Sequence, residues 1–152
     1  MKTVYLTIGH IGSGKSTWAK NYVDNHPDTK IVCADNFRTM LNGTYKYLEE
    51  LDDIITESMV NTATHLLNGG YNVIIDVGNI TNERRSSWLN LPADKKVAIL
   101  LPRENAEWHV ANRETNPHWG AVDWYAIFQG ESNVFDDVDA NDFDEIINVE
   151  KW

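Results

Sequence analysis

The sequence is poor in cysteine and contains no long apolar run. Its 152 residues include a single cysteine, Cys33, which excludes a disulfide within the chain and suits a reducing cytoplasm. No apolar run approaches the roughly 20 residues of a membrane helix, so we expect no membrane partner. The first residues already have a strand pattern, which leaves no room for a signal peptide. We expect a single cytoplasmic domain over residues 1–152, because this length fits one domain with a sizeable core.

Basic residues are also scarce, most of all near the C-terminus. The chain has 13 Lys and Arg against 23 Asp and Glu, a net charge of −10. From Glu131 to Glu150 there are eight acidic residues and no basic one. This segment either forms a solvated acidic face that aids solubility, which we favour, or repels polyanions and disfavours tight non-specific DNA binding.

The most informative stretch is the glycine-rich segment at residues 9–17, Gly-His-Ile-Gly-Ser-Gly-Lys-Ser-Thr. It fits G-x-x-x-x-G-K-[ST] between an apolar strand and a helical pattern, the context that a phosphate-binding loop requires. Glycines let backbone N–H groups approach phosphate oxygens, and the next helix directs its positive dipole end at the same anion. Lys15 can reach the β- and γ-phosphates of ATP, and the Ser16 hydroxyl can ligate Mg²⁺. We therefore predict ATP and Mg²⁺ as cofactors, with ATP held by Gly9, Gly12, Ser13, Gly14, Lys15, Ser16 and Thr17.

Strand and helix patterns alternate along the rest of the chain. Strand-like apolar runs occur at residues 3–8, 31–33, 71–76, 96–101 and 145–149. Helical patterns occur at residues 15–25, 36–41, 45–67, 82–90, 104–114 and 122–129. This alternation predicts an α/β fold with a parallel sheet covered by helices on both faces. The nearly unbroken apolar character of the first strand predicts a central position in the sheet, buried on both faces.

Two acidic residues follow predicted strands at the edge where ligands bind in such sheets. Asp76 occupies the place of an acid that holds Mg²⁺, directly or through water, in P-loop enzymes; its alternative role is to cap the next turn. Asp35 is suited to accept the proton of an attacking hydroxyl, with helix N-capping as the alternative. Arg38 lies one helical turn later, on the same face, and can clamp an anionic group of the substrate.

A further candidate is the segment around residues 113–120, where Asn-Pro-His-Trp-Gly interrupts a helical pattern. A segment that carries Arg113 and ends in glycine has the features of a small lid over ATP. Arg113 would neutralise charge on the transferring phosphoryl group, and the alternative is a surface arginine. Trp119 is the tryptophan suited to stack on a base. Arg84 and Arg85 can reach phosphates or solvent, and we expect one of them to be solvated.

Together these segments resemble the kinase domain of the phage 5′-polynucleotide kinases and their relatives among small P-loop phosphotransferases. The resemblance covers nearly the whole chain, and the phosphate loop combined with Asp35 and Arg38 is far more specific than the loop alone. The matching pieces are residues 6–9, 12–19, 35, 38, 76–79, 83–85, the region near 113 and the ending 141–149.

The resemblance implies a role for each matched residue and an activity for the chain. Lys15 and Ser16 would bind ATP and Mg²⁺, and Asp35 would be the general base. Arg38 would bind a substrate phosphate, Asp76 would support the substrate site, and Arg113 would be a lid arginine.

The expected activity is transfer of the γ-phosphoryl group of ATP to a hydroxyl, favouring the 5′-hydroxyl of DNA or RNA, in the host cytoplasm if a phage encodes the protein. A hydroxymethylated DNA base, a nucleoside and a small metabolite stay open as acceptors. A nucleotide-binding switch without phosphotransfer is the alternative of another class, and the lack of an Asn-Lys-x-Asp motif argues against a GTPase switch. The sequence leaves nucleobase preference and oligomeric state open.

Overall fold

A computed structural model describes residues 2–115 and 122–151 and contains a five-stranded parallel sheet. The strands are β1 (Thr3–Ile8), β2 (Thr29–Cys33), β3 (Asn72–Asp76), β4 (Lys95–Leu100) and β5 (Glu145–Asn148). They lie in the order β2-β3-β1-β4-β5, with Leu6 of β1 opposite Ile75 of β3 and Ala98 of β4. The central position predicted for β1 is confirmed, and the α/β fold with a parallel sheet is confirmed as well.

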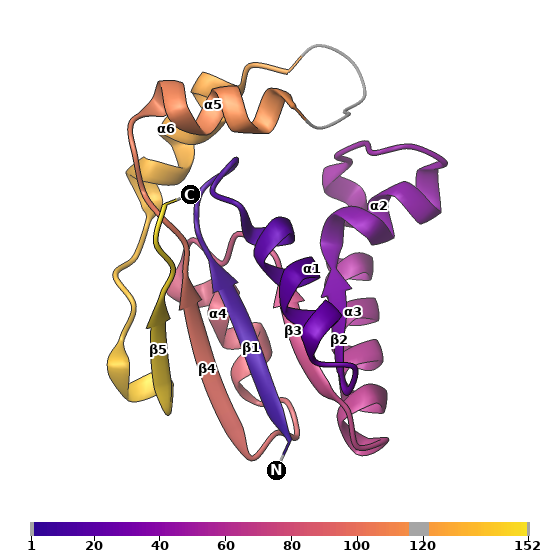
Figure 1. Cartoon of the computed structure of the whole chain (residues 1–152). Helices are drawn as coiled ribbons and strands as arrows, with labels where there is room; N and C mark the ends of the chain where they lie inside the picture. Colours follow the sequence, from indigo (N-terminus) through magenta and orange to yellow (C-terminus); the bar gives the residue numbers. More distant parts are fainter. Residues whose placement is uncertain (1, 116–121, 152) are drawn as a thin grey trace.

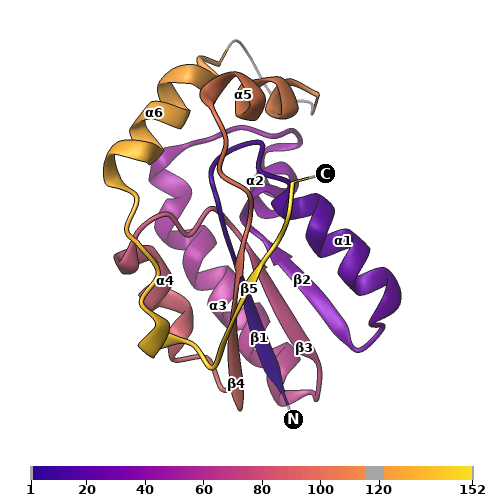
Figure 2. The same cartoon turned by 60° about the vertical axis from the view of Figure 1, so that its left-hand side comes forward.

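Six α-helices in the described ranges surround this sheet. They are α1 (Lys15–Asn25), α2 (Ala34–Asn42), α3 (Asp52–Asn68), α4 (Asn82–Leu89), α5 (Ala106–Glu114) and α6 (Trp124–Val134). Figures 1 and 2 show α1 on one face of the sheet, α3 and α4 on the other, and α5 and α6 across the carboxyl end of the strands. Short 3₁₀ turns occupy Glu49–Leu51 and Ala140–Asp142. No helix in these ranges has the length and apolarity to cross a membrane.

The core lies mainly between α3 and the sheet. Ile55, Met59, Ala63 and Leu67 recur every four residues along α3 and are all buried, as one face of a helix packed on a sheet requires. They meet β-strand side chains and Trp88 of α4 in one continuous cluster. This rigid layer fixes the strand ends from which the site residues project.

The helix predicted for residues 45–67 is wrong at its start. Residues 45–48 have no regular secondary structure, and α3 begins only at Asp52 after a 3₁₀ turn. In this irregular segment Tyr47 donates its hydroxyl hydrogen to Asp52 Oδ2, five residues later, at 2.6 Å. Acidic Asp52 and Asp53 in the first turn of α3 also favour a helix start at that point.

We expected one of Arg84 and Arg85 to be solvated; Arg85 is buried, whereas Arg84 is partly exposed and lines the cleft. Arg85 is 1% exposed, and its guanidinium donates to the carbonyl oxygens of Asn79, Ile80 and Asp136. It thereby ties the loop after β3 to the segment after α6, which is a structural role. Arg84 is half-buried and donates to Thr56 Oγ1 at 2.9 Å.

Acidic side chains in the C-terminal segment form specific contacts. Asp136 accepts from the backbone N–H of Asn82, and Asp144 accepts from that of Lys96, both at 2.8 Å. Glu145 pairs with Lys95 at 2.8 Å. The acidity of this segment therefore helps to attach β5 and its approach to the sheet, in addition to any effect on solubility.

Candidate active site

A cleft of about 1100 Å³ opens at the carboxyl end of the sheet. The loop between β1 and α1 forms its floor, α2 lies along one side, and α5 and α6 lie along the other (Figure 1). The predicted site residues among its lining are Gly12, Ser13, Gly14, Lys15, Ser16, Thr17, Asp35, Arg38, Asp76 and Arg113. Gly9 lies at the start of the loop and donates its N–H to Gly78 O at 3.0 Å, so it anchors the loop to the residues after β3.

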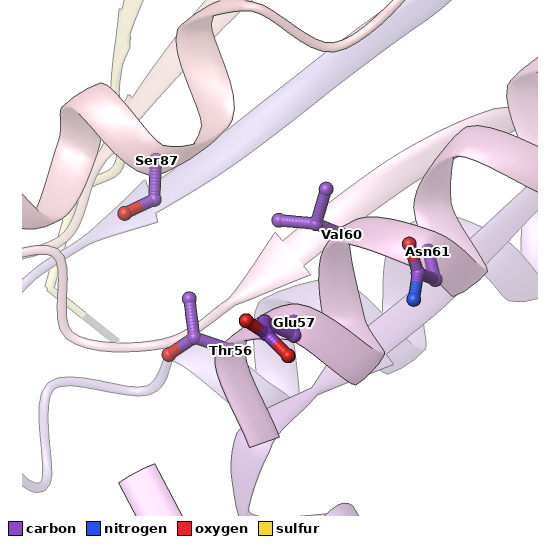
Figure 3. A pocket seen from close by; sticks show the side chains of 5 residues that line it. All are labelled: Thr56, Glu57, Val60, Asn61 and Ser87. Carbon is purple, nitrogen blue, oxygen red and sulfur yellow. The ribbon is translucent and has the colours of Figure 1, made fainter. Parts of the chain in front are cut away.

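A second hollow, of about 480 Å³, lies between α3 and α4, away from these residues. Figure 3 shows Thr56, Glu57, Val60 and Asn61 of α3 lining it together with Ser87 of α4. None of the predicted site residues lines it, so the predicted site coincides with the larger cleft.

Two glycines allow the phosphate loop to take its shape. Gly12 and Gly14 have φ angles of 63° and 93°, a region that side chains disfavour. A Cβ on Gly12 would also collide with the carbonyl oxygen of His109 in α5. The loop is further held by α5, because His109 Nδ1 lies 2.7 Å from Ile11 O and Asn112 donates to Gly12 O. These contacts join the loop to α5.

The start of α1 is arranged as an anion site. Gly14 is its N-cap and provides no side-chain cap, and the first turn carries no acidic side chain. The N–H groups of a first helical turn have no partner within the helix and attract phosphate. Lys15 Nζ donates to the carbonyl oxygens of His10 and Gly9 at 2.8 and 3.2 Å, and burial lowers the pKa of its amine. The lysine thus lies over the loop, partly buried.

Ser16 and Asp76 meet beside this anion site. Ser16 Oγ donates to Asp76 Oδ2 at 2.8 Å, and Asp76 is 5% exposed. Burial raises the pKa of Asp76. The hydrogen bond from Ser16 and the positive charge of Lys15 act in the opposite direction and lower it. Among the residues described, no group of three or more His, Cys, Asp or Glu side chains could hold a metal ion. A hydroxyl and one carboxylate fit Mg²⁺, which keeps several waters and takes its other ligands from phosphates.

Asp35 and Arg38 form an ion pair at the mouth of the cleft. Arg38 Nη1 lies 2.8 Å from Asp35 Oδ1, one helical turn apart as predicted. The Asp35 side chain is 54% exposed, whereas Arg38 is buried. The N-cap of α2 is Cys33, so the N-cap alternative for Asp35 is wrong. An exposed carboxylate at the end of β2 is positioned to accept a proton, and the arginine beside it to bind an anion.

Arg113 connects the two sides of the cleft. Its guanidinium carbon lies 4.2 Å from the centre of the Trp124 ring in α6 and 5.4 Å from that of Tyr45 in the α2–α3 connection. Arg113 therefore faces the cleft and is not a plain surface arginine. Its role as a lid arginine stays a prediction. Residues 116–120 of the predicted lid, Trp119 included, lie outside the described residues.

The sequence analysis missed an acidic residue that touches the phosphate loop. Glu131 of α6 accepts the backbone N–H of Ile11 at 2.9 Å, and burial raises the pKa of its carboxyl. Nothing in the sequence pointed to this contact, because 120 positions separate the two residues. The aromatic residues Tyr45, Tyr47 and Trp124 also line the cleft and were not predicted as site residues.

Comparison with known proteins supports this assignment of the fold and the phosphate loop. A family model described as AAA domain matches residues 4–119. A chain of the Pnkp1/Rnl/Hen1 RNA repair complex has a TM-score of 0.70 and 21% identity, covering 89% of this chain and 46% of that one. A fungal RNA kinase has a TM-score of 0.63 and 13% identity, covering 99% of this chain and 75% of its own.

A third similar structure is a gluconokinase from Sinorhizobium meliloti 1021, with a TM-score of 0.63 and 12% identity, covering 97% of this chain and 81% of its own. At these identities the likeness shows the fold alone. The chain spans less than half the length of the chains that it matches in the Pnkp1/Rnl/Hen1 complexes.

Proposed function

The chain belongs to the AAA domain family AAA_33, and we propose that it is an ATP-dependent kinase for the 5′-hydroxyl of a nucleic acid, with residues 1–152 acting as one kinase domain. Membership of this family implies ATP binding at the phosphate loop. The single observation that supports a kinase is the Asp35–Arg38 ion pair at 2.8 Å, in the same cleft as that loop. This pair favours a kinase over a nucleotide switch, since transfer to a hydroxyl uses a base and an anion-binding group near the phosphate loop.

The proposed reaction assigns one task to each residue. The acceptor oxygen attacks the γ-phosphorus, the bond from that phosphorus to the β,γ-bridging oxygen breaks, and ADP leaves. Asp35 takes the proton of the acceptor hydroxyl. Lys15, the N–H groups at the start of α1 and Arg113 stabilise the negative charge spread over the transferring group.

Mg²⁺ would be held by Ser16, with Asp76 orienting the Ser16 hydroxyl at 2.8 Å. The ion supplies charge neutralisation on the β- and γ-phosphates when it is bound. Asp76 would also support the substrate site through this contact. Arg38 would bind the phosphate that follows the reacting nucleoside, since a guanidinium matches phosphate geometry.

The charge of the cleft supports an anionic acceptor. The whole chain has a net charge of −10, yet the described lining of the cleft carries six basic side chains and three acidic ones. The basic ones are Lys15, Lys20, Arg38, Lys46, Arg84 and Arg113, and the acidic ones are Asp35, Asp76 and Glu131. The cleft thus has an excess of basic side chains, which favours a nucleotide and a phosphate-bearing acceptor.

The test is a panel of acceptors incubated with γ-labelled ATP. The panel contains 5′-hydroxyl DNA and RNA oligonucleotides, hydroxymethyl-base DNA with blocked 5′ ends, nucleosides, and small sugars such as gluconate. We expect label on the 5′ ends of the oligonucleotides. A Lys15→Ala variant prepared in the same way controls for contaminating kinases, and its label should be absent although circular dichroism shows it folded. Label confined to a modified base, a nucleoside or a sugar would overturn the nucleic-acid end as acceptor.

A further inference from the structure

Tyr47 combines features that a surface tyrosine does not ordinarily have. It lines the cleft in the irregular segment between α2 and α3, and it is 56% exposed. Its hydroxyl nevertheless donates to Asp52 Oδ2 at 2.6 Å, and this bond raises the pKa of the phenol to about 12. The ring is thus held in place while most of its surface faces solvent.

The same ring contacts the arginine of the ion pair. The guanidinium carbon of Arg38 lies 5.1 Å from the centre of the Tyr47 ring. Asp52 joins the two, because its other carboxylate oxygen accepts from Arg38 Nη2 at 3.4 Å. Arg38 is therefore fixed by Asp35 on one side and by the Tyr47–Asp52 pair on the other.

An ordered, exposed aromatic ring beside a phosphate-binding arginine has the properties of a base-stacking surface. The base of a nucleotide lies next to its own phosphate, so a phosphate bound by Arg38 brings a base close to Tyr47. Stacking on an aromatic ring tolerates any base, because every base offers a π face. The hydroxyl bond to Asp52 lowers the entropy that the ring loses when a base packs on it.

We propose that Tyr47 stacks on the base of the 5′-terminal nucleotide of the acceptor and so selects nucleic acid over acceptors that lack a base. This inference rests on the proposed function and names the residue by which that function recognises its substrate class. A sugar or another metabolite without a base would not stack on the ring, so Tyr47 would not increase its affinity for the site.

The experiment uses two 5′-hydroxyl oligonucleotides that differ only in the 5′-terminal residue, one carrying its base and the other abasic. The KM for each acceptor is measured with the wild-type chain and with Tyr47→Phe, Tyr47→Leu and Tyr71→Leu. Tyr47→Phe keeps the ring and removes the bond to Asp52. Tyr71, which is 41% exposed and lies just before β3, provides the matched control for loss of an exposed tyrosine.

We expect the wild-type chain to show a KM roughly 5- to 100-fold higher for the abasic acceptor, the usual range for one stacked base. The ratio of the abasic KM to the KM of the intact acceptor should fall to about one in Tyr47→Leu, because the stacking ring is lost. The ratio should persist in Tyr47→Phe, which keeps the ring, and in Tyr71→Leu. A purely structural role through Arg38 would raise both KM values together and leave the ratio unchanged.

The possible failures are distinguishable. If the wild-type chain labels neither oligonucleotide while it binds ATP, both the proposed function and this inference are overturned. If it labels both with equal KM, or if Tyr47→Leu preserves the ratio, the 5′-kinase function stands and the stacking role of Tyr47 is rejected.

Discussion

The backbone N–H of Ile11 donates a hydrogen bond to the carboxylate of Glu131 at 2.9 Å, so one N–H group of the phosphate loop already has an acidic partner. The negative charge of this carboxylate also acts to raise the pKa of the Lys15 amine, against the effect of burial. A phosphate bound at this loop therefore meets a negative group of the protein itself. Glu131 fastens α6 to the loop, and we expect this contact to weaken nucleotide binding.

The first prediction is that Glu131→Gln binds ATP more tightly. Glutamine retains an oxygen that can accept the Ile11 N–H, while the like charge near the phosphates disappears. We expect a gain in affinity of about threefold to tenfold, which corresponds to roughly 1 kcal/mol for a screened charge pair. Isothermal titration with a non-hydrolysable ATP analogue measures it.

The pH dependence of the same measurement provides a control. Burial raises the pKa of Glu131, so its carboxyl takes up a proton at a higher pH than an ordinary glutamate. As the pH falls through that pKa, the difference between the two proteins should shrink, because the wild-type side chain becomes neutral too. Weaker ATP binding in Glu131→Gln would show instead that the charge is needed to dock α6.

The second prediction concerns Asp35→Asn, which should keep ATP affinity and lose turnover by about 10²-fold or more, the usual scale for a lost general base. The side chain is 54% exposed at the mouth of the cleft, and asparagine can still contact Arg38. Nucleotide titration and steady-state kinetics on the same preparation separate binding from chemistry.

Asp53→Asn, an exposed change at the start of α3, is the matched control and should leave both quantities unchanged. If Asp35→Asn loses ATP binding and yet turns over bound ATP normally, Asp35 is a nucleotide ligand. The general-base assignment would then be wrong.

The sheet and the phosphate loop were predictable because local sequence determines them. The run from Thr3 to Ile8 is largely apolar, as is typical of a strand that is covered on both faces. Gly12, Gly14 and Lys15 form a contiguous motif whose spacing carries the loop geometry. Asp35 and Arg38 are three residues apart, so helical geometry alone brings them together.

The contacts that sequence reasoning missed are long-range or depend on competition between elements. Glu131 reaches Ile11 only because α6 folds back over the loop, and no spacing encodes that return. The sequence did not distinguish Arg85 from Arg84, because carbonyl acceptors that hold Arg85 come from the segment after α6. The residues before α3 continue a helical pattern, but residues 45–48 are irregular and Tyr47 bonds to Asp52, the first residue of α3.

The third prediction concerns the acid stability of the loop packing. His10 is 1% exposed and lies between the rings of His109, Phe128 and Phe135. Burial, together with the charges of Arg103, His109 and Lys15, lowers its pKa from 6.5 to about 4.

The unfolded chain therefore binds this proton first as the pH falls. The stability that neutral His10 provides is complete above pH 6.5 and is lost progressively between about 6.5 and 4. We expect urea unfolding to show a loss of about 2 kcal/mol from pH 7 to pH 5 due to His10. His10→Phe keeps the ring contacts without a titrating group, so its loss over the same interval should be smaller by about that amount. An equal pH dependence in the two proteins would contradict the assignment.

The last prediction concerns the number of phosphates that the acceptor site binds. Of the six basic side chains that line the cleft, Arg38 is the one paired with Asp35, the proposed general base, so it is the best-placed cation for a phosphate beside the reacting hydroxyl. Each phosphate contact on a single strand lowers the logarithm of affinity by about 0.7 per logarithmic unit of salt. We expect the logarithm of acceptor affinity to fall with the logarithm of salt concentration with a shallow slope of about −0.7 to −1.4, which corresponds to about one or two phosphate contacts.

Arg38→Ala should raise the apparent KM for 5′-hydroxyl oligonucleotides and make the salt slope shallower by about 0.7, because one phosphate contact is lost. The KM for ATP should stay unchanged, since the guanidinium pairs with Asp35 and Asp52 on the acceptor side of the cleft. Lys30→Ala, an exposed change on β2, is the matched control for loss of one positive charge and should alter neither quantity. A slope several times steeper, or one that Arg38→Ala leaves intact, would mean that the strand is bound over a longer surface and that Arg38 does not hold the phosphate beside the reacting hydroxyl.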